Sequence, residues 1–262
     1  MSCAIHIREL CHRYPNGKVA LDGLDLRVEH GERVAILGPN GAGKTTLMLH
    51  LNGLLIAGSG ALEVAGLDVC KQALPELRAR VGLVFQDPDD QLFMPTVGED
   101  VAFGPLNMKL PRAEVEARVA HALAAVRMDH AIDRAPHQLS QGERRRVAIA
   151  TVLAMGPQLL VLDEPSANLD PRARRELVEL LAGIDRTMLI VTHDLPFAAE
   201  ICERAVILAA GRIVADGDTH EILSDTPLLA AHDLELPAGL DLDRIELRPR
   251  PSREASRSLV AI

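Results

Sequence analysis

Three continuous apolar runs, each followed directly by polar residues, constrain the fold of this chain most strongly. They cover residues 34–37, 159–162 and 188–191, and the polar endings read GPNGAGKTT, DEP and THD. A short run that is apolar at every position is typical of a strand buried on both faces of a parallel sheet. Ligands bind beyond the carboxyl ends of the strands in an open α/β sheet, so the three endings are expected to meet at one pocket.

The segment before the first run has a different pattern. Leu24, Leu26 and Val28 alternate with charged residues, which predicts a half-buried antiparallel strand. Ile5 and Ile7 indicate a partner strand across the turn at residues 15–17. The sequence therefore predicts an antiparallel β subdomain near the N-terminus.

A helical pattern separates the first and second apolar runs. Between about residues 111 and 155, Val115, Val119 and Leu123 recur on one helical face. This pattern predicts a helical subdomain, at about residues 88–156, inserted between two halves of the parallel sheet.

The first polar ending fits the pattern G-x-x-x-x-G-K-S/T from Gly38 to Thr45. Glycines in such a loop let backbone N–H groups turn inward around phosphates, Lys44 adds a positive charge, and the Thr45 hydroxyl can hold Mg²⁺. A helix from Lys44 to about Leu51 would direct its positive N-terminal end at the anion. The plainer alternative is a glycine-rich turn before a helix.

The second ending supplies two carboxylates, Asp163 and Glu164, at the end of a buried strand. Beside a phosphate loop, one carboxylate can order Mg²⁺ while the other polarises an attacking water. The alternative is a helix N-cap with a first-turn acid, but Pro165 is expected to hold Glu164 in an extended conformation.

Composition limits the partners of the chain. Its 262 residues are 48% apolar and carry a net charge of −9, which argues against nucleic acid as a partner. No apolar run approaches the ~18 residues that span a bilayer. The four scattered Cys indicate a reducing compartment. We therefore expect a cytoplasmic protein that reaches a membrane through a partner, with a frayed, solvated tail at residues 244–257.

The segment LSQGE, residues 139–143, gives the chain its family resemblance. With the phosphate loop and the two carboxylates, it resembles an ATP-binding cassette (ABC) subunit of a transporter over about residues 5–217. The family signature is usually Leu-Ser-Gly-Gly-Gln, so Gln141 and Glu143 depart from it while Ser140 and Gly142 remain. Ser140 and Glu143 also have the spacing of a capping box, and both interpretations can hold together.

The resemblance implies a RecA-like P-loop NTPase core and a role for each matched residue. Tyr14 matches an aromatic that stacks on adenine, Gln86 the glutamine that joins the site to the helical subdomain, and His193 the switch histidine. Catalysis is then expected from Lys44, Gln86, Glu164 and His193, and Mg²⁺ binding from Thr45, Gln86 and Asp163. ATP contacts are expected from Tyr14, Gly38, Pro39, Asn40, Gly41, Ala42, Gly43, Lys44, Thr45, Thr46, Ser140, Gly142 and Asp170.

In this family the signature of one subunit completes the phosphate site of another, and Asp170 resembles the loop that crosses between them. The resemblance therefore implies a head-to-tail dimer with ATP between two chains. Both halves of the composite site are intact in this sequence, which favours a homodimer over pairing with a paralogue.

The segment FQDPDDQLF, residues 85–93, resembles the ATPases of energy-coupling factor importers, particularly the cobalt and nickel type. In that family this region grips helices of a transmembrane partner, and exposed Phe and Met beside acidic residues suit such a contact. A calcium loop is disfavoured because Gly98 stands where its final Glu should be. A buried aromatic cluster that fixes the helical subdomain to the sheet is the open alternative.

These features predict the ATPase of a membrane importer, with a transmembrane coupling subunit and a substrate-capture membrane subunit as partners. The ATP-binding domain is expected over residues 1–217 and a short C-terminal extension over 218–262. Cobalt or nickel is the leading cargo. The alternatives are a vitamin importer of the same group and, from another class, a non-transport cassette protein acting on nucleic acid or ribosomes.

Overall fold

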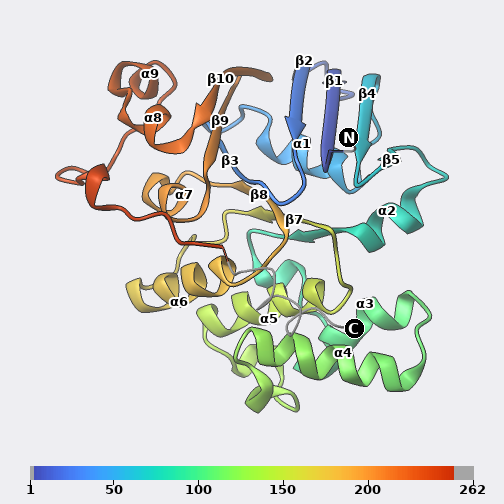
Figure 1. Cartoon of the computed structure of the whole chain (residues 1–262). Coiled ribbons are helices and arrows are strands. Elements are labelled where there is room, and N and C mark those ends of the chain that lie inside the picture. Colours follow the sequence, from blue (N-terminus) through green and yellow to red (C-terminus); the bar gives the residue numbers. More distant parts are fainter. Residues whose placement is uncertain (1–2, 251–262) are drawn as a thin grey trace.

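The computed structural model describes residues 3–250, which contain a six-stranded and a four-stranded sheet with helices packed around them (Figure 1). The strands are β1 (Ile5–Arg13), β2 (Val19–Val28), β3 (Arg33–Leu37), β4 (Ser59–Val64), β5 (Leu67–Asp68), β6 (Val81–Val84), β7 (Leu159–Asp163), β8 (Thr187–Val191), β9 (Arg204–Ala209) and β10 (Arg212–Asp218). The helices are α1 (Lys44–Leu51), α2 (Leu74–Arg80), α3 (Val97–Asn107), α4 (Arg112–Ala125), α5 (Gln141–Leu153), α6 (Pro171–Ala182), α7 (Leu195–Ile201), α8 (Thr219–Ser224) and α9 (Thr226–Ala231).

The six-stranded sheet contains all three apolar runs, as predicted. They become β3, β7 and β8, and every residue of these strands is buried. The strand order is β10-β9-β3-β8-β7-β6, with parallel pairing from β9 to β6 and an antiparallel edge strand β10. Because β3, β8 and β7 are parallel neighbours, their polar endings emerge at the same edge of the sheet.

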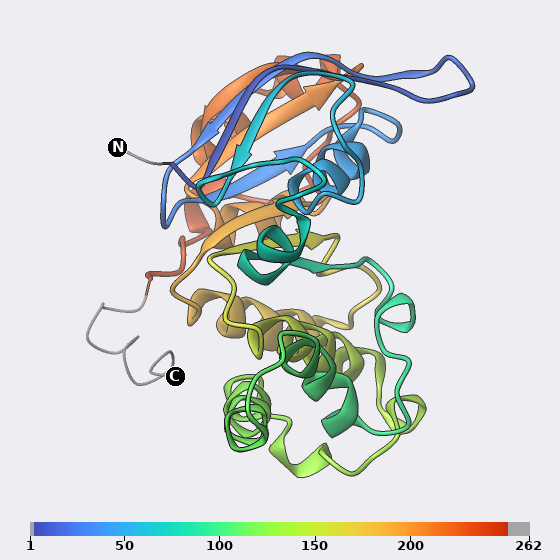
Figure 2. The ribbon, with the colours of Figure 1, turned by 90° about the vertical axis from the view of Figure 1, so that its right-hand side faces the viewer.

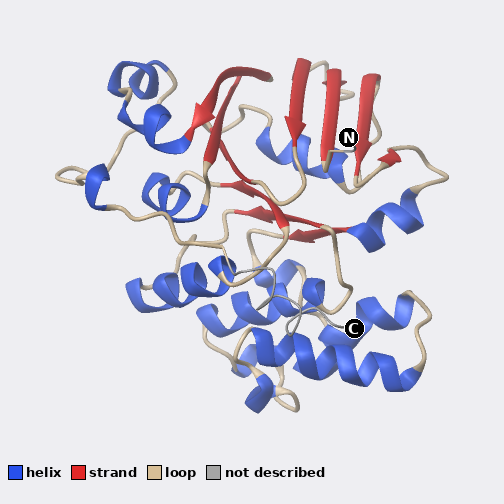
Figure 3. Ribbon diagram, in the orientation of Figure 1, coloured by secondary structure: helices blue, strands red, loops and turns tan. Residues whose placement is uncertain are grey.

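The four-stranded sheet is the predicted antiparallel subdomain. Its order is β2-β1-β4-β5, and Ile5 and Ile7 pair with Val28 and Leu26 across the hairpin. Figure 3 shows this sheet with α1 lying between it and the larger sheet. A shared apolar cluster of the two sheets and α1 includes Ile7, Ile36 and Leu47. The segment between β3 and α1, which is predicted to bind phosphate, is thus flanked by the packed strands of both sheets.

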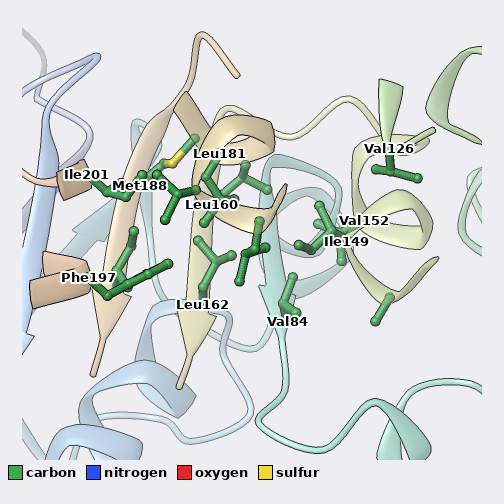
Figure 4. Close-up of a cluster of buried hydrophobic side chains, with 14 of the residues drawn as sticks. Val84, Val126, Ile149, Val152, Leu160, Leu162, Leu181, Met188, Phe197 and Ile201 are labelled. Atoms are coloured by element: carbon green, nitrogen blue, oxygen red, sulfur yellow. The ribbon is translucent and has the colours of Figure 1, made fainter. Parts of the chain in front are cut away.

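The segment between β6 and β7 is helical and forms the predicted helical subdomain. Val115, Val119 and Leu123 of α4 are buried, which confirms the helical face read from the sequence. Figure 2 shows α3, α4 and α5 gathered below the larger sheet. Close to the sheet, Ile149 and Val152 of α5 share a core with Leu160 and Leu162 of β7 (Figure 4). The helical subdomain therefore packs directly on the sheet that carries the site.

The C-terminal segment is bound to the core further than the sequence predicted. The Arg250 guanidinium donates from Nε and Nη2 to the two carboxylate oxygens of Glu203, both at 2.7 Å. The N–H of Arg248 donates to the Glu200 carbonyl at 2.9 Å. Residues 244–250 are exposed except for the half-buried Ile245, as expected of a solvated segment, but Arg248 and Arg250 are hydrogen-bonded to the core and the pair at Arg250 is bidentate. The rest of the expected tail, residues 251–257, lies outside the described part. Within residues 3–250, no helix has the length and apolarity required to cross a membrane.

Candidate nucleotide site

The loop between β3 and α1 has backbone conformations that require glycine. Gly38 and Gly43 have φ of 140° and 111°, and a Cβ at Gly43 would lie 2.4 Å from the carbonyl oxygen of Ala20. Lys44 Nζ donates to the carbonyls of Gly38 and Pro39 at 2.6 and 3.0 Å. The ammonium group is thus held against the loop at the N-terminal end of α1, an end that favours anions.

A cavity of about 180 Å³ brings most of the predicted site residues together. The residues that line it are Tyr14, Lys18, Ala20, Asn40, Gly41, Ala42, Gly43, Lys44, Thr45, Thr46, Gln86, Asp163, Glu164 and Val191. The third ending does not line the cavity, but His193, which is 69% exposed, contacts the cavity-lining Glu164. The first two predicted endings therefore meet at one pocket, and the third lies directly beside it. Gly38 and Pro39 lie in the loop behind the cavity, where Pro39 contacts Lys44.

The two carboxylates at the end of β7 make this cavity suited to a cation. Burial and the neighbouring Glu164 raise the pKa of Asp163 to about 6, while Lys44 and Arg145 oppose that shift. Burial lowers the pKa of Lys44, and Glu164 and Asp163 oppose that change. Thr45, Gln86 and Asp163 offer hydroxyl, amide and carboxylate oxygens, the hard ligands that Mg²⁺ prefers. The donor set therefore fits Mg²⁺.

Glu164 is bound to β8 through its backbone and to His193, two residues beyond that strand, through its side chain. Its N–H donates to the Val191 carbonyl at 2.8 Å, and its Oε2 lies 2.8 Å from His193 Nδ1. Its φ is 43°, so the expectation that Pro165 keeps it extended is wrong. The contacts with Val191 and His193 overcome the conformational preference of a residue before proline. The side chain is 12% exposed and lines the cavity that holds the phosphate loop.

Tyr14 lies at the cavity and is half-buried, not a core residue. Its hydroxyl is 3.0 Å from Thr46 Oγ1, and its ring meets the His12 ring at an interplanar angle of 80°. The N–H of Tyr14 donates to the carbonyl of Lys18, which lines the same cavity. Sequence reasoning missed Lys18, although a lysine four residues after Tyr14 in the same turn was a usable signal.

Arg145 is a second residue that sequence reasoning missed. It is 1% exposed and donates to the carbonyls of Phe85 and Gln86 at 2.8 and 2.6 Å. The contact fixes the Gln86 backbone to α5, the helix that begins within the LSQGE segment. The run Arg144 to Arg146 gave no signal as to which of three arginines faces inward.

Ser140, Gly142 and Asp170 lie together in a second cavity of about 670 Å³, lined by none of the residues that line the first. The Ser140 hydroxyl accepts from the Glu143 N–H, and the Glu143 carboxylate accepts from the Ser140 N–H at 2.8 Å. This is the capping box that the spacing predicted. Asp170 caps α6 by accepting from the N–H groups of Arg172 and Ala173.

The aromatic segment before α3 places Phe93 at the surface. The side chain is 62% exposed, and its ring meets that of the 40% exposed Phe103 edge to face, 5.0 Å between centroids. The buried Asp100 carboxylate accepts from the N–H groups of Phe93 and Met94, both at 3.0 Å. Phe85 instead packs partly buried against the core. The buried-cluster alternative therefore fits Phe85 but not Phe93.

Comparison with known proteins shows the family. A family model described as ABC transporter matches residues 21–167. A putative ABC transporter ATP-binding protein of Streptomyces avermitilis is 60% identical over 91% of each chain. The energy-coupling factor transporter ATP-binding protein EcfA of Methanothermobacter thermautotrophicus is 48% identical, over 91% of this chain and 78% of its own.

Two solved structures show the same fold. The first is cbiO1 from Clostridium perfringens, part of the ABC transporter complex cbiONQ, with 38% identity, a TM-score of 0.79 and coverage of 90% of this chain and 97% of its own. The second is the ATP-binding cassette MJ0796, a dimer bound to ADP and Pi, with 27% identity, a TM-score of 0.73 and coverage of 82% and 98%. The chain therefore belongs to the ABC transporter family, as an ATP-binding subunit that couples ATP hydrolysis to transport.

Proposed function

We propose that the protein is the ATPase of a multisubunit importer, in which two copies bind ATP head to tail and hydrolysis drives uptake of a small solute. The main support for this proposal is that the two cavities are separate. Ser140, Gly142 and Asp170 line a cavity that shares no residue with the cavity at the phosphate loop of their own chain. They can contact an ATP only if it is bound by another chain, and both halves are present here, so a homodimer with two composite sites follows.

Within each site, the residues of the first cavity have different roles in hydrolysis. Lys44 and the N–H groups of the loop bind the phosphates, which is mostly positioning and charge stabilisation. Glu164 accepts the proton of the attacking water, and His193 holds the Glu164 carboxylate at 2.8 Å and faces the γ-phosphate. Tyr14 stacks on adenine. Mg²⁺, when bound to Thr45, Gln86 and Asp163, supplies positive charge to the phosphate oxygens.

The domain plan supports the same function. We assign the ATP-binding domain to residues 1–217, with the helical subdomain at about 88–156, and the C-terminal extension to 218–262. The segment around Phe93 and Phe103 on this subdomain is the contact for a transmembrane coupling subunit. This contact holds the ATPase at the cytoplasmic face of the cell membrane, in a complex that also contains a substrate-capture membrane subunit.

The cargo that we propose is a cobalt or nickel ion. The support is the segment at residues 85–93 and the likeness to cbiO1, which is part of the cbiONQ complex. The likeness to EcfA keeps a vitamin importer as the second candidate. The transporter family match disfavours the non-transport alternative.

Purification from membranes with the partner subunits tests the cargo. We expect the assembled complex, reconstituted in vesicles, to take up Co²⁺ or Ni²⁺ in an ATP-dependent manner, because the capture subunit selects the solute. The measurement is vesicle metal content with Mg²⁺-ATP against ADP. ATP-dependent uptake of a vitamin without metal uptake would replace the metal assignment with the second candidate.

The dimer can be trapped by removing the base. We expect Glu164→Gln to accumulate as a dimer in saturating Mg²⁺-ATP and to remain monomeric in ADP, because Ser140 and Gly142 contact the γ-phosphate only in trans. Light scattering gives the mass directly. Adding Ser140→Arg, which fills the second cavity with a long cation, should abolish the dimer. A monomeric mass for Glu164→Gln in saturating ATP contradicts the sandwich.

A further inference from the structure

Arg174 joins the two helices that follow the DEP and THD endings. It lies on the first turns of α6, and its Nε and Nη2 donate to the two carboxylate oxygens of Asp194, at 2.9 and 3.3 Å. Its Nη1 donates to Glu200 on α7 at 2.6 Å, and its guanidinium lies 5.5 Å from the centroid of the Phe197 ring. One side chain therefore fixes α6 to both ends of α7.

These contacts complete a path from Asp170 to Glu164. The N–H of Arg174 donates to the Asp170 carbonyl at 2.9 Å, so the α6 turn that carries Arg174 begins at Asp170. Asp194 directly follows His193 in the chain, and its carboxylate also accepts from the Phe197 N–H at 2.9 Å as the N-cap of α7. His193 in turn contacts Glu164. Every step is a hydrogen bond, an ion pair or a peptide bond.

The environment of Arg174 shields its ion pairs from solvent better than the environment of Arg172 on the same helix. The side chains of Arg174, Asp194 and Glu200 are only 23%, 24% and 18% exposed. Although burial acts against the charge, the bonds from Arg174 and the Phe197 N–H hold the pKa of Asp194 below its ordinary value. Arg172, two residues earlier, pairs with Glu176 while 83% exposed, a geometry that contributes little.

We propose that Arg174 is a positioning residue that couples Asp170, at the face of the partner chain, to the His193–Glu164 pair of its own chain. This inference rests on the proposed head-to-tail dimer, in which Asp170 contacts the second subunit. A displacement of Asp170 by the partner moves the first turn of α6, and Arg174 passes that displacement to Asp194 and the adjacent His193. The state of one ATP site thereby adjusts the catalytic pair of the other.

Four single variants and one double variant, Arg174→Ala with Asp194→Asn, test the coupling without removing a residue of the catalytic pair. Arg174→Ala breaks the link from α6. Asp194→Asn breaks it from α7 and keeps the cap, because Asn is as good an N-cap as Asp. Arg174→Lys retains the charge and one of the contacts. Arg175→Ala is the matched control, an exposed arginine one position further along α6 for which the described residues offer no ion pair.

The measurements are kcat, the Hill coefficient for ATP, the affinity for a fluorescent (MANT) ATP analogue, and the melting temperature. We expect Arg174→Ala to lower kcat by about 2- to 30-fold, the range for residues that modulate coupling between sites, with unchanged MANT-ATP affinity. The Hill coefficient should fall toward one. Asp194→Asn should act similarly, the double variant should be no worse than either single one, and Arg174→Lys should recover part of the loss.

Three results would overturn the inference. They are a parental kcat and Hill coefficient in Arg174→Ala, an equal loss in Arg175→Ala, and additive losses in the double variant. A parent protein that hydrolyses ATP without cooperativity, together with a monomeric Glu164→Gln variant in ATP, would instead remove the proposed dimer itself. Measurements on the unmodified protein and on the Glu164→Gln variant therefore test the proposed dimer separately. The Arg174 variants then test only the coupling.

Discussion

Replacing Glu164 with Gln is expected to slow ATP hydrolysis by about 10²–10⁴-fold, the loss typical of removing a general base. Gln has nearly the same shape as Glu, so it can still accept the N–H of His193, but it cannot take a proton from water. The side chain of Glu164 is 12% exposed and lines the cavity that holds Lys44 and Thr45. The loss should therefore appear in kcat, with ATP affinity retained.

Phosphate release in Mg²⁺-ATP measures the rate, and the fluorescent ATP analogue measures binding. Glu116→Gln is the matched control, because Glu116 is 64% exposed and pairs with Arg112 on the surface of α4. That variant should hydrolyse ATP at the parental rate. If Glu164→Gln binds ATP and also turns over at the parental rate, another residue is the base.

The parallel strands and the glycine-rich loop could be predicted, because local sequence patterns determine them. A run that is apolar at every position can only be satisfied by burial on both faces, so residues 34–37, 159–162 and 188–191 indicated parallel strands. The glycine spacing before Lys44 likewise reflects conformations that other residues rarely adopt. These local signals were sufficient to predict that the first two strand endings meet at one pocket.

The order of the strands and the start of α3 were not predictable by the same reasoning. The central strand β3 pairs with β8 and β9, more than 150 residues later in the chain, and no local pattern specifies that choice. Helix α3 contains Gly98, Gly104 and Pro105, residues that disfavour helices. It forms because Thr96 and Glu99 cap it and because Val97 and Val101 are buried.

The side-chain contacts of the site also depend on tertiary structure. Pro165 favours an extended Glu164, yet the hydrogen bond to Val191 and the contact with His193 impose a φ of 43°. The role of Arg174 also depends on tertiary structure. It is one of several arginines on α6, and it differs from Arg172 in facing α7. Sequence reasoning located the elements of the site, whereas the packing between α6, α7 and β8 decides which side chains act together.

The exposed Phe93 should prove essential for capture of the membrane partner. Truncating an apolar anchor at the centre of an interface typically costs more than ~2 kcal/mol, or about 30-fold in affinity. We expect Phe93→Ala to lose copurification with the membrane subunits and uptake by the assembled complex together. Because the side chain is 62% exposed and absent from the nucleotide cavity, basal ATPase and melting temperature of the isolated protein should change little.

Two control variants distinguish a role of Phe93 in partner binding from a role in folding stability. Leu54→Ala removes another large exposed apolar side chain, 49% exposed and outside the helical subdomain, and should leave partner capture intact. Phe197→Ala empties a fully buried site and should cost about 3–5 kcal/mol of folding stability. If Phe93→Ala behaves like Phe197→Ala, with a large drop in melting temperature and unchanged partner capture, Phe93 is structural. Full loss of capture at parental stability instead identifies Phe93 as the anchor through which ATP hydrolysis is coupled to the membrane subunits.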